Sequence, residues 1–302
     1  MASAIPLPAW LKRMIVPCWN AAHHHTGFAF SYLDAGVHGH VESCAVCGRY
    51  RPMLYRRRII PRRLVEIWGL SPTLAGAFAR KESCFCSGCG ANLRARRMAR
   101  ALLSLYPVGT PPTPCRSLAR WVEYSESESL RIAEINRIDG LHEELIWLPR
   151  LSSSDFHPGS APGSIVGGVR SEDLSRLTYA DESFDIVLTS ETLEHVPDLA
   201  AALHEIRRVL APSGRHIFTI PQLPDVQTTF ARSIVLSDGS IQDRAPRICH
   251  PGGDVGYPVF TEFGADIQDV FVRAGFDLDV WFGPNRDEDV AQVFVSRKTR
   301  DG

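Results

Sequence analysis

The chain has 302 residues, which is enough for two domains of ordinary size. Hydrophobic residues make up 44% and charged residues 22%, proportions that are ordinary for a soluble globular protein. No apolar run reaches the roughly 18 residues that a membrane-spanning helix needs, so a spanning segment is excluded. The first residues also lack the charged and then apolar pattern of a signal peptide, and we therefore predict a cytoplasmic protein.

Charge is divided sharply along the chain. Residues 1–110 hold 15 Lys and Arg against 4 Asp and Glu, whereas the remainder holds 18 against 30. This asymmetry predicts two units with different surfaces. The basic unit could meet nucleic acid, but a charged block more often faces solvent or docks on an oppositely charged surface. We favour that second interpretation over a nucleic-acid partner.

The basic unit carries two cysteine knuckles. Their sequences are Cys44-Ala-Val-Cys47-Gly and Cys86-Ser-Gly-Cys89-Gly. Each knuckle can aim two thiolates at one ion, and the glycine after it eases the turn, so the four cysteines predict a tetrahedral structural zinc site. Cys84 is an alternative ligand to Cys86 because it lies only two residues away.

Two other interpretations of these cysteines are weaker. A cytoplasmic chain disfavours disulfides, and a redox C-x-x-C pair would need no second knuckle. A site closed by four cysteines has no open position for substrate, so we expect the zinc to stabilise the module rather than to catalyse.

The basic unit ends in a helix and a linker. Residues 92–106 place Met98, Leu102 and Leu105 on one face and Arg96 and Arg100 on another, which predicts a basic amphipathic helix. The proline-rich segment 107–114 ends it and separates a zinc-knuckle module and linker, 1–114, from a second domain, 115–302.

The second domain shows a strand–helix–strand order. The apolar run 186–188 predicts a buried strand, and Asp198 caps a helix with one apolar stripe. The segment 211–214 should end that helix, and residues 216–221 return as a parallel strand. Two further strands, 276–282 and 289–296, predict a closing antiparallel hairpin after a helix over about 263–274.

The string LTYADESFDIVLTSETLEHVPDLAAALHEIRRVLAPSGRHIFTIP resembles the central motifs of class I S-adenosylmethionine-dependent methyltransferases of the type 11 kind. The resemblance implies an α/β fold, a doubly wound seven-stranded Rossmann-like sheet. In that family FDIVL ends the fourth strand, and the R-V-L-x-P-x-G turn leads to the fifth.

The resemblance also implies where S-adenosylmethionine would bind. It places Glu134 near the methionine end, Asp155 on the ribose hydroxyls and Asp173 with Leu174 at the adenine. Acids that end parallel strands do face the crevice where nucleotides bind in open α/β sheets. Ser190 and Glu191 would line the methionine pocket.

The loop after the first strand departs from the family pattern. The family has three spaced glycines there, but this chain has Asn136, Ile138 and Gly140, of which only Gly140 matches. Asparagine tolerates a left-handed backbone, whereas isoleucine is bulky where the cofactor should approach. We therefore expect Asn136 and Gly140 to contribute to cofactor binding, on a loop that takes another path or in an impaired site.

Two histidines are candidate catalytic bases. His195 follows the fourth strand, and His250 lies in a glycine-rich loop before the last helix. Either could take a proton from an acceptor hydroxyl near neutral pH, or could instead only shape the pocket. We predict a methyltransferase acting on a small molecule or saccharide. The alternatives are a cofactor-blind scaffold and an RNA or protein methyltransferase recruited by the basic module. The oligomeric state is open.

Overall fold

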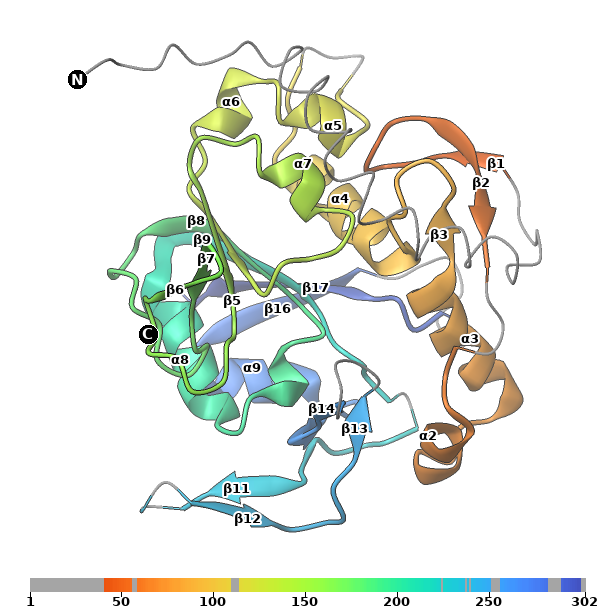
Figure 1. The fold of residues 1–302 in the computed structure, drawn as a ribbon, viewed down its shortest axis with the longest axis vertical. Coiled ribbons are helices and arrows are strands. Elements are labelled where there is room, and N and C mark those ends of the chain that lie inside the picture. The colour runs from red at the N-terminus through yellow and green to blue at the C-terminus, as the bar shows by residue number, and fades with distance from the viewer. Residues whose placement is uncertain are drawn as a thin grey trace.

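A computed structural model of the chain describes residues 41–55, 59–109, 114–223, 225–236, 238, 240–250, 256–281 and 289–299. An eight-stranded sheet forms its centre (Figure 1). In spatial order its strands are β16 (Phe276–Trp281), β17 (Val293–Lys298), β9 (Leu210–Thr219), β8 (Phe184–Ser190), β4 (Ile132–Ile135), β5 (Leu151–Asp155), β7 (Val169–Ser171) and β6 (Ile165–Val166).

The sheet confirms the predicted α/β class. Strands β9, β8, β4, β5 and β7 run parallel, and β17 lies antiparallel between β16 and β9, which is the predicted closing hairpin. The eighth strand, β6, is a two-residue edge strand antiparallel to β7. It is one strand more than the seven expected. A strand of two residues shows no alternation of polar and apolar positions, so the sequence could not predict it.

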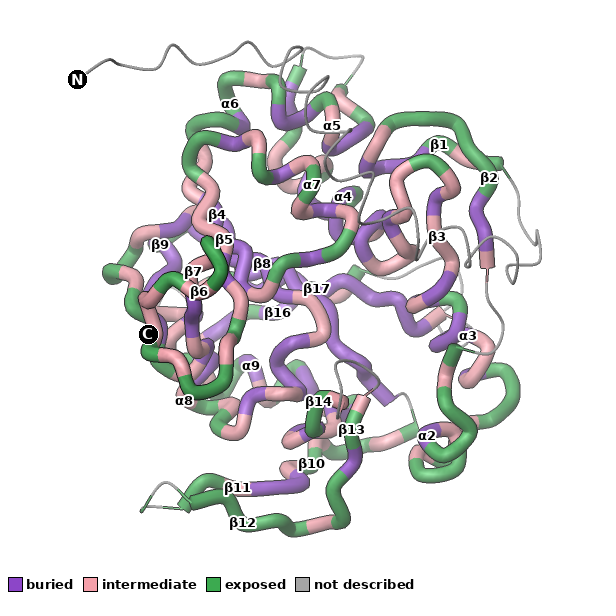
Figure 2. Tube along the Cα trace, viewed as in Figure 1, coloured by how far each residue is buried: buried purple, intermediate pink, exposed green. Residues whose placement is uncertain are grey.

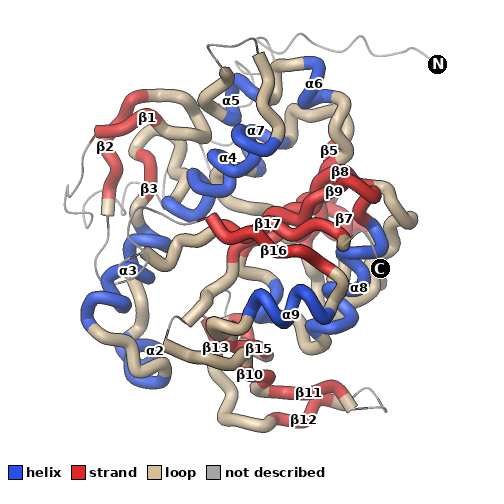
Figure 3. Tube along the Cα trace, turned by 180° about the vertical axis from the view of Figure 1, so that it is seen from behind, coloured by secondary structure: helices blue, strands red, loops and turns tan. Residues whose placement is uncertain are grey.

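Helices cover both faces of the sheet (Figure 3). The described helices are α2 (Arg62–Ile67), α3 (Pro72–Ser83), α4 (Leu93–Leu105), α5 (Leu118–Trp121), α6 (Ser125–Glu128), α7 (His142–Leu145), the 3-10 helix η1 (Leu193–His195), α8 (Leu199–Val209) and α9 (Ile267–Arg273). As expected, Asp198 caps α8, since its Oδ1 accepts from the Ala201 amide at 2.9 Å. None of the helices in the described ranges is long and apolar enough to cross a bilayer.

Alternate side chains of the central strands enter two separate cores. Ala133 and Val187 pack with α8 and α9, whereas Ile132 and Ile186 pack with α4, α5 and α7. Figure 2 shows how completely these central strands are buried. The second of these cores also contains Cys44 and Cys86, so the cysteine module and the sheet share one hydrophobic cluster.

The amino-terminal module consists of a small sheet and helices α2 to α4. Its strands are β1 (Val41–Ser43), β2 (Tyr50–Leu54) and β3 (Phe85–Cys86), all antiparallel. Helix α4 confirms the predicted helix after the second knuckle, and the Asn92 side chain caps it by accepting from the Ala95 amide at 2.9 Å.

The arginines of α4 do not form one exposed basic face. Contrary to the expected helical face, Arg96 is buried, and it donates to the carbonyl oxygens of Cys84 and Ala91 at 2.8 and 3.2 Å. Arg97 forms a two-bond ion pair with Asp289, which lies just before β17. This pair favours the interpretation in which the basic module docks on the acidic part of its own chain.

Small antiparallel ribbons lie between β9 and α9. Their strands are β10 (Phe230–Ala231), β11 (Ser233–Val235), β12 (Ile241–Asp243), β13 (Cys249–His250), β14 (Tyr257–Pro258) and β15 (Thr261–Glu262). The pairs are β10 with β15, β11 with β12, and β13 with β14. A main-chain bond from the Phe260 amide to the Glu194 carbonyl at 2.7 Å ties this insertion to the end of β8.

Candidate functional site

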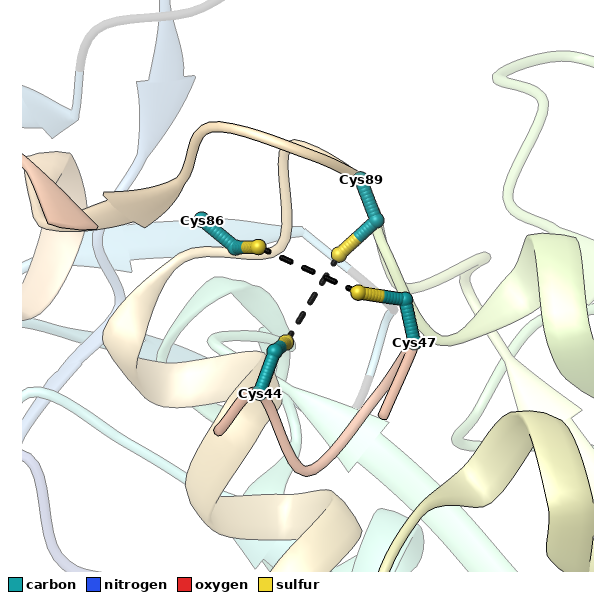
Figure 4. A group of neighbouring side chains, drawn as sticks. All are labelled: Cys44, Cys47, Cys86 and Cys89. Atoms are coloured by element: carbon teal, nitrogen blue, oxygen red, sulfur yellow. Dashed lines mark hydrogen bonds between the residues drawn. The ribbon is translucent and has the colours of Figure 1, made fainter. Parts of the chain in front are cut away.

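The four predicted zinc ligands converge. The sulfurs of Cys44, Cys47, Cys86 and Cys89 point toward one another from the two knuckles (Figure 4). The Sγ atoms of Cys44 and Cys89 lie 3.7 Å apart, and those of Cys47 and Cys86 lie 3.9 Å apart. Four sulfurs about 2.3 Å from one tetrahedral zinc ion would lie about 3.8 Å from each other, so the group fits zinc.

Cys84 lies outside this group of four. Its Sγ instead lies 3.8 Å from Nη2 of Arg96, and its carbonyl accepts from the same guanidinium. The structure therefore favours Cys86 over Cys84 as the ligand from the second knuckle.

At the end of β4, Glu134 is fully engaged by its own chain. One carboxylate oxygen accepts from the Ile138 amide at 3.0 Å, and the other lies 2.6 Å from Nδ1 of His142 and 3.0 Å from the Ser153 hydroxyl. Burial disfavours the charged imidazole of His142, but the Glu134 carboxylate outweighs it and raises the pKa of His142. In this structure Glu134 shapes the loop after β4.

That loop accommodates both departures from the glycine pattern. Asn136 has a φ of 61°, the left-handed conformation that asparagine tolerates. The Ile138 side chain is buried in the core shared with the cysteine module. Gly140 has a φ of 84°, and a Cβ on it would lie 2.7 Å from Cα of Ala91, directly after the second knuckle. The loop is thus packed against the module, and the Ile138 side chain is buried in the core that the loop and the module share.

Asp155 ends β5, where the family would hold a ribose. Its carboxylate accepts from the Arg137 backbone amide at 2.9 Å and from Nε of the same residue at 2.7 Å. Burial would raise the pKa of Asp155, but the bonds and charge of Arg137 lower it below its usual value. The Arg137 side chain is 43% exposed, so it can turn into solvent and release the carboxylate.

A cavity of about 420 Å³ opens beside this position, at the carboxyl ends of β5 and β7. Phe156, Glu172 and Asp173 are among its lining residues, and Phe156 is 55% exposed. Asp173 accepts from Ser175 and Arg176 at 2.6 and 2.9 Å, and Leu174 is buried beneath. An exposed aromatic ring and a carboxylate that line the same cavity are suited to a nucleoside.

Two cations from the module reach the end of β8. Lys81 of α3 is fully buried; its Nζ lies 2.8 Å from Glu191 and donates to the Ile220 carbonyl at 3.0 Å. Arg94 of α4 lies 3.9 Å from the same carboxylate. Burial would raise the pKa of Glu191, but these two charges lower it. Glu191 also has a φ of 49°, strain of the kind that collects at functional sites. The neighbouring Ser190 hydroxyl bonds to Thr219 at 2.9 Å.

The two candidate histidines meet beside Glu194. The ring centroids of His195 and His250 are 4.9 Å apart, and Glu194 Oε1 lies 3.5 Å from Nε2 of His195 and 3.8 Å from Nδ1 of His250. Nδ1 of His195 donates to the Pro258 carbonyl at 2.7 Å, which leaves a lone pair on Nε2. Burial lowers the pKa of His195, and it lowers the pKa of His250 to about 4, so both rings are neutral near pH 7.

Sequence reasoning placed the carboxylates and histidines but missed their basic partners. Lys81, Arg94 and Arg137 carry no motif, and Lys81 lies 110 positions before Glu191 in the chain. The available signal was the position of Lys81 on an otherwise apolar face of its helix. A lysine at such a position becomes buried, and lysines are rarely buried without a partner.

A family model described as "Methyltransferase domain" matches residues 157–218. No curated protein matches the chain. Among solved structures, an S-adenosylmethionine-dependent methyltransferase from Mesorhizobium loti is 19% identical, with a TM-score of 0.36, over 59% of this chain and 96% of that one. A putative methyltransferase in complex with the Trm112 activator from Haloferax volcanii is 13% identical, with a TM-score of 0.38, over 58% and 85%.

The matched segment runs from the cavity through β6 and β7 to η1, α8 and most of β9. It therefore includes Asp173, Glu191 and His195, three of the side chains at the carboxyl edge of the sheet. Residues 157–218 of this chain thus match a methyltransferase domain, and they lie in an α/β fold whose second core is shared with a four-cysteine module.

Proposed function

We propose that the chain transfers a methyl group from S-adenosylmethionine to a hydroxyl of a small molecule or saccharide. The observation that carries the proposal is the cavity at the ends of β5 and β7, which adjoins the matched segment and is lined by Phe156 and Asp173. In open α/β sheets this edge is where nucleotides bind.

Residues at this edge have distinct roles in the proposal. Asp155 would accept the ribose hydroxyls, because its Oδ1 keeps a lone pair beyond the one that the Arg137 amide uses. Its Oδ2 lies 2.7 and 2.6 Å from Nε and Nη2 of Arg137 and would become available once that guanidinium turns into solvent. Asp173 and Leu174 would hold the adenine. Ser190 and Glu191 would line the methionine end, with Glu134 holding the loop of Asn136 and Gly140 in place.

S-adenosylmethionine supplies the electrophilic methyl group of its sulfonium. The chain must align an acceptor with that methyl group and take up the acceptor's proton. His195 and His250 lie where the insertion meets η1, just after β8, and Nε2 of His195 carries a lone pair. This placement supports proton uptake at the histidine pair.

A scaffold that binds no cofactor is the second candidate. It is favoured by the engagement of Glu134 and Asp155 with the chain's own groups. Calorimetric titration with S-adenosylhomocysteine separates the two proposals. The enzyme proposal predicts a measurable heat of binding, and Asp155→Ala should weaken the affinity by about 10- to 100-fold through loss of charge-assisted bonds.

The matched control is Asp277→Ala, which removes an exposed carboxylate on β16, away from the cavity. It should bind S-adenosylhomocysteine as the native protein does. Absence of any heat with the native protein would overturn the enzymatic proposal and leave the scaffold.

A further inference from the structure

Three acceptor groups converge on one buried point without a donor between them. Glu194 has no exposed surface, and neither of its carboxylate oxygens receives a hydrogen bond from any described residue. His250 presents Nδ1 to Glu194 at 3.8 Å, and its other ring nitrogen, Nε2, is likewise buried and unpartnered among these residues. A carboxylate buried without a partner is costly, so its persistence calls for a bound cation or proton.

The geometry of the three side chains fits a metal ion. One ligand atom from each of Glu194, His195 and His250 can be chosen so that all lie within 4.8 Å of one another. The separations of 3.5 and 3.8 Å from Glu194 Oε1 to the two rings are close to the roughly 3.4 Å between donors that lie 2.0–2.2 Å from a tetrahedral ion.

The two histidine rings are held by neighbouring groups, as metal-binding histidines usually are. His195 donates its other ring N–H to the Pro258 carbonyl, and such a bond fixes the tautomer that aims Nε2 at an ion. The ring of Trp68 packs edge-on against His250 with centroids 5.4 Å apart, and its indole N–H donates to Glu262 at 2.9 Å. Both histidine rings are thereby held in place.

The local charge also favours a cation. Two cations, Lys81 and Arg94, are near this point. Glu82 and Glu191 each lie within 4.0 Å of both cations. These four charges cancel, so an ionised Glu194 is left without a counter-charge.

We propose that Glu194, His195 and His250 form a second metal site, which binds a divalent transition-metal ion, zinc by preference. Two imidazoles and one carboxylate suit zinc better than magnesium, which prefers oxygen ligands. Three protein ligands leave a coordination position open, unlike the four-cysteine site.

A consequence for chemistry rests on the proposed function. An acceptor hydroxyl at the open position would lose its proton more readily, because the ion stabilises the alkoxide. His195 would then act as a ligand, and the proton would leave to solvent or to a neighbouring carboxylate.

Zinc content of the full chain tests the site without any assay of activity. After dialysis against buffered zinc, the native protein should hold two equivalents. Glu194→Gln keeps the shape of the side chain but removes its charge, and His250→Asn removes a ligand; each should hold one equivalent, with affinity at the second site at least about 100-fold weaker.

The matched control is His204→Asn, which removes an exposed histidine from α8 and should keep two equivalents. One equivalent retained in each variant, at the cysteines, also shows that the module is folded. Cobalt substitution of the native protein gives a second measurement that needs no variant. Cobalt at the cysteines gives intense thiolate charge-transfer bands, and a second ion at imidazole and carboxylate ligands should add weaker visible bands without them.

Native protein that takes up a single equivalent and shows only thiolate-bound cobalt would overturn the metal proposal. So would a second equivalent that Glu194→Gln leaves in place. Neither result affects the calorimetric test with S-adenosylhomocysteine, so the two proposals can fail separately.

Discussion

At the residue scale, the Asp185 carboxylate of β8 binds Arg131, the residue directly before β4. It thereby links the amino-terminal ends of two neighbouring strands. It accepts from the backbone amide, Nε and Nη2 of Arg131, at 2.9, 3.1 and 2.6 Å. These bonds lower the pKa of Asp185. A carboxyl whose pKa is lowered by folding stabilises the protein above its unfolded pKa, and that stability is lost as the pH falls through the folded value.

Asp185→Asn should therefore lower the free energy of unfolding by about 1 kcal/mol at pH 7, a modest loss because the pair is about one-third exposed. The difference from the native protein should shrink below about pH 4 as Asp185 protonates. Urea unfolding at several pH values measures it. A zinc ion at the four thiolates would leave both proteins in acid, so only their difference is compared. Asp277→Asn, on exposed β16, should show no such pH-dependent loss.

Single residues mark the limit of what the sequence could predict. The family resemblance, with its spacing between acids, placed Asp155 and Asp173 at one edge of the sheet. It could not show that Arg137 or Lys81 pairs with a carboxylate, since long side chains reach partners at any separation in the chain. Ile138 looked like an obstacle because its neighbours in the cysteine module are about 40 or more positions away.

At the element scale, the loop between β4 and α7 packs against the cysteine module. Gly140 and Gly159 both have a left-handed backbone, with φ of 84° and 81°, but only a Cβ on Gly140 would clash, at 2.7 Å from Ala91. Gly159→Ala should cost about 1 kcal/mol from its backbone alone. Gly140→Ala should cost at least about 1–3 kcal/mol more, because backbone atoms must move.

Thermal or urea unfolding of the two variants measures this difference. Equal losses would mean that the loop and the second knuckle are not in close contact. A greater loss for Gly140→Ala would support the packing that removes Ile138 from the cofactor's side of the loop.

Elements were predicted better than their ends. The helix after Asp198 and the closing hairpin were expected, because each has a long periodic pattern or a turn signal. The segment 211–214 was expected to stop the helix, whereas it already belongs to β9, which pairs with β8 through an irregular register at Phe184. Such an irregularity depends on the partner strand and leaves no local pattern.

At the scale of the whole molecule, the shared core predicts that the module and the sheet unfold as one unit. Cys44 and Cys86 are in the same buried cluster as Ile132, Ile186 and Leu188 of the central strands. Removing zinc from the cysteines with a strong chelator should therefore raise amide hydrogen exchange in β4 and β8 together with the module.

Amides of α8 and α9 are the internal control, because these helices pack in the other core, with Ile206 and Phe271. They should keep more of their protection. Faster exchange confined to residues 41–109 would show instead that the module unfolds alone, and would support the boundary near residue 114 that the linker predicted.

The buried lysine of α3 has a consequence for how the two halves of this gene can evolve. Lys81 finds both its counter-charge and its acceptor, Glu191 and the Ile220 carbonyl, in the other half of the chain. A chimaera that joined this module to a foreign transferase would leave the buried ammonium group without Glu191, its nearest anion, and with only Glu82 at 4.0 Å, so the chimaera should be strongly destabilised. Recombination that separates the two halves should therefore fail, and descendants of this gene should change positions 81 and 191 in concert or not at all.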